Sequence, residues 1–129
     1  MVDTQGLLMA ALVHPASVHD RDGGVQLVSG LFGLYPFLQK LFADSGYAGP
    51  TFRKGVKKAC PRLQVAIVKR PKKTKGFVVL PKRWIVERSI AWLNRCRRLA
   101  KDWENLSSRA LAFVHLASIR MMLRKLCNQ

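Results

Sequence analysis

Three short apolar runs limit the folds that are open to this chain. They occupy residues 7–13 (LLMAALV), 37–43 (FLQKLFA) and 63–68 (LQVAIV). Runs of this length with turn residues nearby predict buried strands. Because segments with helical character separate them, the sequence predicts an α/β domain in which helices flank a thin sheet.

Four helices are expected, at residues 24–34, 51–59, 81–100 and 109–126. We expect Asp20 or Asp22 to cap the first and Thr51 to cap the second, since their side-chain oxygens accept orphan backbone N–H groups. Pro81 suits the first turn of the third helix, where its missing N–H costs nothing. Residues 69–76 read as a basic loop.

The charge is divided very unevenly along the chain. Residues 1–50 hold two basic and four acidic side chains, whereas residues 51–129 hold 21 basic and three acidic ones. A net charge of +16 with this asymmetry indicates a polyanionic partner, and nucleic acid is the commonest. A basic surface without a partner, or one that binds acidic lipid, is the alternative.

Cysteine usage and hydropathy indicate a cytoplasmic protein with no membrane partner, and a nucleic-acid partner would associate it with the nucleoid. No apolar run reaches the roughly 18 residues that a transmembrane helix needs, and the N-terminus has no secretory signal pattern. Three widely spaced cysteines exclude a self-contained disulfide framework and a CxxC-type zinc site.

Two acidic residues stand out. Asp44 directly follows an apolar run, where α/β folds place their chemistry, although the local residues favour a turn aspartate that bonds its own backbone. Glu87 lies on a polar stripe of the 81–100 helix, opposite an apolar arc that includes Val86, Ile90 and Trp92. It is either a metal-binding carboxylate or the partner of Arg83 one turn away.

Three blocks resemble the catalytic domain of DDE-type transposases of bacterial insertion sequences. They are VDTQGLLMAALVHPASVHDRDGG, FADSGYAGPTFR and RWIVERSIAWLNRCRRLAKDWEN, and they cover nearly the whole chain in order. The resemblance implies a ribonuclease-H-like fold, in which a mixed sheet is flanked by helices. It also implies that Asp44 is the second acid of the catalytic triad and Glu87 the third.

The chain departs from the family pattern in two places. Around the glutamate, Arg83 matches the signature arginine, but Leu80 replaces the tyrosine and Asn94 the lysine. The first catalytic aspartate of the family lies upstream of the VDTxGL hairpin. In this sequence, residues Met1-Val2-Asp3 already belong to that hairpin. We therefore expect residues 1–129 to be one truncated catalytic domain of partial ribonuclease-H-like fold, with the first strand missing and no separate DNA-binding domain.

The resemblance implies metal-dependent cleavage of DNA at element ends and strand transfer to a target. Two divalent ions, Mg²⁺ or Mn²⁺, would stabilise the attacking and leaving oxygens, with Asp44 and Glu87 as ligands. Without the first aspartate, we expect the chain alone to be inactive or nearly so. The alternatives are a non-catalytic DNA-binding remnant that regulates a full-length transposase, and a small basic RNA-binding protein of the ribosomal kind.

The expected partners are terminal-repeat and target DNA, together with a second copy of the chain or a full-length transposase. The stacking of bases on Trp84 is a further possibility, whereas Trp92 is expected in the core. The cations and the amide assigned to DNA contacts are Arg83, Arg88, Asn94, Arg95, Arg98, Lys69, Arg70, Lys72, Lys73 and Lys75.

Overall fold

A computed structural model describes residues 1–31, 33–69 and 82–127 of the chain. The chain divides into two compact units. One is continuous and contains residues 15–83; the other joins residues 1–14 to residues 84–129. None of the described helices combines the length and the apolar character that crossing a bilayer requires.

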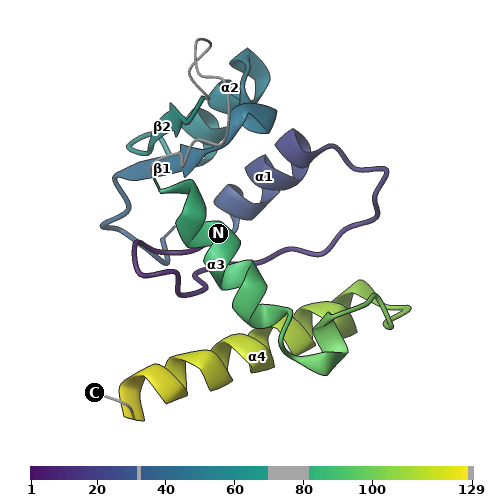
Figure 1. The fold of residues 1–129 in the computed structure, drawn as a ribbon. Coiled ribbons are helices and arrows are strands. Elements are labelled where there is room, and N and C mark those ends of the chain that lie inside the picture. The colour runs from purple at the N-terminus through teal and green to yellow at the C-terminus, as the bar shows by residue number, and fades with distance from the viewer. Residues whose placement is uncertain (32, 70–81, 128–129) are drawn as a thin grey trace, which may run out of the picture. The chain divides into compact units, whose positions relative to one another are not determined.

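The continuous unit is built around two parallel strands (Figure 1). Its elements are α1 (Asp20–Ser29), β1 (Lys40–Ala43), the 3₁₀ turn η1 (Ser45–Tyr47), α2 (Pro50–Ala59) and β2 (Gln64–Ile67). Lys40 pairs with Gln64 and Ala43 with Ile67. Parallel strands need a crossover connection, and α2 supplies it.

Apolar packing holds this unit together. Val28 of α1, Phe52 and Val56 of α2, and Leu63 before β2 are buried and form one cluster. Leu41 and Ala43 pack against the cluster while Lys40 and Phe42 are exposed. One face of the strand pair therefore lies on the core, as strand alternation requires.

α1 and α2 pack very closely. A Cβ atom added at Gly55 would lie 2.6 Å from a methyl carbon of Val25. The contact is possible only because glycine has no side chain. Gly55 thereby lets the two helices share one apolar cluster.

The second unit combines the N-terminal hairpin with the C-terminal helices. Val2 and Leu8 form one antiparallel bridge. The helices are α3 (Arg83–Leu93), the 3₁₀ turn η2 (Arg97–Leu99) and α4 (Ser107–Cys127). Arg98 of η2 donates to Glu104 at 2.7 Å, and its guanidinium lies 5.1 Å from the ring centre of Phe113 in α4.

The α/β class is confirmed, and so are the strands at 37–43 and 63–68, although both are shorter than predicted. The expected strand at 7–13 is wrong, because the described residues offer that segment a single bridge and no continuous partner. Among the described residues the sheet is a parallel pair.

The helix boundaries correct several expectations. α1 begins at Asp20, and its N-cap is His19, whose side chain makes no capping bond; Asp20 and Asp22 lie in the first turn, where they face the positive end of the helix dipole. Gly49 rather than Thr51 is the N-cap of α2. The expected helix at 81–100 ends at Leu93. Most of the predicted basic loop lies outside the described residues.

Candidate functional site

Asp44 follows β1 and is exposed to solvent. It is the N-cap of η1: its Oδ1 accepts a hydrogen bond from Gly46 N at 2.8 Å, and its carbonyl accepts one from Tyr47 N at 3.2 Å. No other described residue bonds the carboxylate. The turn bond therefore fixes one carboxylate oxygen and leaves the second one available.

The turn that carries Asp44 is held by its neighbours. Arg21 of α1 donates from Nε to the carbonyl of Gly46 at 3.0 Å. The Tyr47 ring packs on Phe52, with the ring centres 5.0 Å apart. Burial raises the pKa of Tyr47 above its usual value, and the charges of Asp20 and Asp44 raise it further. The Tyr47 side chain thus lies in the field of both carboxylates.

Glu87 lies in the second turn of α3 and is exposed. The following residues fasten this helix to the N-terminal hairpin. Ser89 is 1% exposed, and its Oγ lies 2.7 Å from the carbonyl of Gly6 and 2.9 Å from that of Ile85. A hydroxyl has one proton, so Ser89 donates to one of these carbonyls at a time.

Gly6 is required at this contact. Its φ is +86°, and a Cβ atom there would lie 2.7 Å from Ser89 Oγ. Asp3 shapes the turn, since its Oδ1 accepts from Gln5 N at 2.8 Å and from Leu7 N at 2.9 Å. Lys125 of α4 also donates to the Gln5 side chain, at 2.5 Å. The hairpin therefore contacts both α3 and α4.

Arg88 serves the same attachment. Its Nη2 donates to the carbonyl of Gln5 at 2.8 Å, and its guanidinium lies 4.5 Å from the ring centre of Trp84 and 4.8 Å from that of Trp92. The Nε atom is buried and has no partner among the described residues. Trp84 is 46% exposed and Trp92 38% exposed. The expectation that Trp92 lies in the core is therefore wrong, because its ring lies against a guanidinium instead.

The apolar arc predicted for this helix is only partly buried. Ile85 is 9% exposed, but Val86 and Ile90 are 42% and 52% exposed. Ser89, one of the most buried residues of α3, was not predicted to be buried. No local pattern signals this burial, because its partner Gly6 lies 83 positions away.

The remaining residues assigned to DNA contacts lie in different settings. Lys69 is exposed after β2, Arg83 opens α3, and Asn94 and Arg95 are exposed just after it. Arg98 is paired with Glu104. Arg70, Lys72, Lys73 and Lys75 fall outside the described residues.

Asp44 and Glu87 belong to different units, and their sharing one metal cluster stays a prediction. Within the part of the chain that the structure describes, no group of three or more His, Cys, Asp or Glu side chains is placed to hold a metal ion. Each carboxylate by itself has the right chemistry, since oxygen ligands are those that Mg²⁺ prefers.

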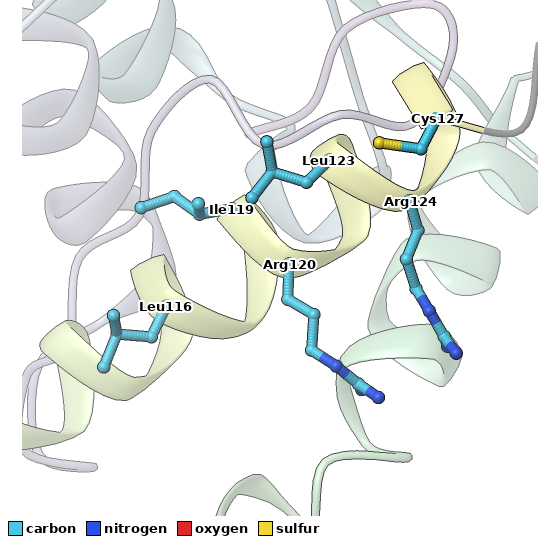
Figure 2. A pocket seen from close by; sticks show the side chains of 6 residues that line it. All are labelled: Leu116, Ile119, Arg120, Leu123, Arg124 and Cys127. Carbon is cyan, nitrogen blue, oxygen red and sulfur yellow. The ribbon is translucent and has the colours of Figure 1, made fainter.

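A shallow pocket on α4 has a different character. It is lined by Leu116, Ile119, Arg120, Leu123, Arg124 and Cys127. Figure 2 shows the side chains of Arg120 and Arg124 extending in the same direction from the helix. No carboxylate lines this pocket, so it is no candidate for a magnesium site.

Comparison with known protein families identifies a matching family model. The transposase DDE domain family matches residues 1–122, which is nearly the whole chain. A search of curated proteins found no match, and a search of solved structures found none either. The match includes Asp44, Glu87 and the hairpin around Gly6. The chain therefore belongs to the family of transposase DDE domains.

Proposed function

We propose that this chain supplies two of the catalytic carboxylates for DNA transposition by metal-dependent cleavage and transfer of DNA strands at insertion-sequence ends. The family match over residues 1–122 carries the proposal. The position of Asp44 supports it, because α/β folds bind ligands at the carboxyl ends of parallel strands. A ribonuclease-H-like fold is part of the same proposal.

Asp44 and Glu87 are the residues that would hold divalent cations, Mg²⁺ or Mn²⁺. When bound, such ions compensate the negative charge that develops on the attacking and leaving oxygens at phosphorus. Asp44 has one oxygen bonded to Gly46 N, which leaves the other for a cation. Glu87 is exposed on α3.

The surrounding residues position these two acids. Arg21 and Tyr47 fix the turn that follows β1, so the Asp44 carboxylate keeps one orientation. Arg88 and Ser89 attach α3 to the hairpin, which sets the rotation of the helix that carries Glu87. These are positioning roles, because none of the four side chains needs to touch the reacting phosphate.

Binding of Mn²⁺ to the full chain tests the proposal. Electron paramagnetic resonance measures free Mn²⁺ during a titration, with and without a DNA duplex that carries the element's terminal repeats. We expect Asp44→Asn and Glu87→Gln each to weaken Mn²⁺ binding at least tenfold, roughly the loss of one charged ligand interaction. Asp102→Asn is the matched control, since Asp102 is an exposed acid outside the proposed site.

Two outcomes would contradict the proposal. Equal Mn²⁺ affinity in all three variants and the wild type would remove Asp44 and Glu87 from any metal site. DNA binding without carboxylate-dependent Mn²⁺ binding would instead favour a non-catalytic DNA-binding regulator.

A further inference from the structure

One face of α2 carries cations that the proposed metal site does not use. Arg53, Lys54, Lys57 and Lys58 are exposed, and the helix contains no acidic residue. At about 100° per residue, the four fall within an arc of about 140°. Their side chains make no hydrogen bond or ion pair with any other residue that the structure describes.

The opposite side of α2 is anchored in the core. Val56 is 0% exposed and Phe52 is 2% exposed. The close contact of Gly55 with Val25 further fixes the rotation of the helix. The four cations are consequently held on the surface by a rigid support, which lowers the entropy cost of using them together.

Other cations of the chain are already engaged. Arg88 bonds the Gln5 carbonyl, Arg98 pairs with Glu104, and Lys125 bonds the Gln5 side chain. A phosphate contact by any of these would compete with a contact inside the protein. The cations of α2 meet no such competition from the described residues.

We propose that this face of α2 binds the phosphate backbone of double-stranded DNA. The inference rests on the proposed function, which makes DNA the partner, and adds the surface on which the duplex lies. Arg53 and Lys57 form one row and Lys54 and Lys58 a second, each with a rise of about 6 Å between its members. Paired rows of charge without aromatic or amide groups suit the backbone rather than base edges.

An acidic lipid surface is a poorer fit. A helix that lies on a membrane inserts an apolar face below its charged residues. The large apolar residues of α2, Phe52 and Val56, are buried in the protein core instead. The face that carries the cations has none to insert.

Salt-dependent DNA binding tests the inference. The triple variant Arg53→Gln/Lys54→Gln/Lys57→Gln is compared with Arg109→Gln/Arg120→Gln/Arg124→Gln, which removes three exposed cations of α4. Both lower the net charge from +16 by the same amount, and glutamine keeps a similar helix propensity. Fluorescence anisotropy with a labelled duplex of random sequence gives the affinity at several salt concentrations.

The α2 variant should bind roughly tenfold or more weakly, and its log–log salt slope should be less steep by about 2.7, because each lost phosphate contact removes about 0.9. The α4 variant should keep a slope close to that of the wild type. Circular dichroism checks that both variants are folded.

Each other outcome has a distinct meaning. If the α2 and α4 variants lost DNA affinity equally, the inference would be overturned, because net charge rather than the position of the cations would then explain binding. Binding of both variants to phosphatidylserine vesicles is measured as well. If the α2 variant lost affinity for the vesicles but bound DNA like the wild type, the inference would be overturned in favour of lipid. A wild type that does not bind the duplex at all would contradict the proposed function itself.

Discussion

The two units of the chain are stabilised in different ways. The continuous unit, residues 15–83, contains the buried cluster of Val28, Phe52, Val56 and Leu63. Among the described residues of the discontinuous unit, 1–14 with 84–127, the buried side chains are the apolar Ile85 and the polar Ser89 and Ser118, and several apolar residues on α4 are exposed. Its segments are joined by hydrogen bonds from Ser89, Arg88 and Lys125 to the hairpin.

The difference concerns the kind of interaction that sets each acid in place. Burial of a large apolar side chain contributes roughly 1.5–3 kcal/mol, whereas a hydrogen bond contributes a net of about 0.5–1.5 kcal/mol. The unit that carries Asp44 thus relies mainly on apolar burial, whereas the unit that carries Glu87 relies more on hydrogen bonds. Substitutions in the two units should differ accordingly.

The largest expected effect comes from Phe52→Ala. Phe52 is 2% exposed, so its loss should reduce the free energy of unfolding of the continuous unit by about 3–5 kcal/mol. Hydrogen–deuterium exchange measured peptide by peptide should show faster exchange in α1 and α2. Phe37→Ala is the matched control, because Phe37 is 89% exposed in the same unit.

This variant also tests the division into units. Peptides from the hairpin and α3 should keep the exchange rates of the wild type. If exchange in these peptides becomes faster together with exchange in α1 and α2, the two units unfold cooperatively. They would then have one common stability, and the contrast between them would not hold.

Ser89→Ala should have a smaller effect, about 1–3 kcal/mol, because the buried carbonyl of Gly6 would lose its partner. Exchange should rise in the hairpin and α3. The control is Ser118→Ala: Ser118 is also buried, but its Oγ bonds Val114 of the same helix at 2.7 Å. Equal exchange in the two variants would show that the hairpin is held by something other than Ser89.

The smallest effect is on a single ionisation. In a Tyr35→Phe background, where Tyr47 is the remaining tyrosine, Asp20→Asn should lower the pKa of Tyr47 by removing one of the charges that raise it. Burial is the main cause, so the pKa should stay above its usual value. Ultraviolet absorbance of the phenolate measures it. An unchanged pKa would show that the charge of Asp20 does not affect the ionisation of Tyr47.

The sign of the pH effect on stability follows from the same shift. A raised pKa means that the folded chain holds the Tyr47 proton more tightly than the unfolded chain does. The resulting stabilisation is fully present below the usual tyrosine pKa of about 10 and is lost as the pH rises through the raised value.

Sequence patterns predicted the continuous unit better than the discontinuous one. The strands expected at 37–43 and 63–68 and the helix expected at 51–59 rest on local signals, and β1, β2 and α2 appear at those places. The run at 7–13 carries a similar signal but forms no strand, since strand formation depends on a partner that local composition does not specify.

The setting of the candidate site was less predictable. That Asp44 follows a strand was expected and is confirmed, but the contacts of Arg21 and Tyr47 with its turn were not anticipated. Arg88 and Ser89 each contact a hairpin residue 83 positions earlier in the chain. Sequence periodicity carries no information on contacts between residues so far apart. The metal and DNA roles of the assigned residues stay predictions.

The attachment of the hairpin to α3 and α4 has a consequence for biosynthesis. The hairpin leaves the ribosome before its partners, because Ser89 and Lys125 are translated 83 and 120 residues after Gly6 and Gln5. The continuous unit can fold while translation proceeds, because its contacts close within one segment. The hairpin contacts are complete only after α4 has been synthesised, so a ribosome stalled before α4 would carry a nascent chain with an ordered Asp44 turn and an unanchored hairpin.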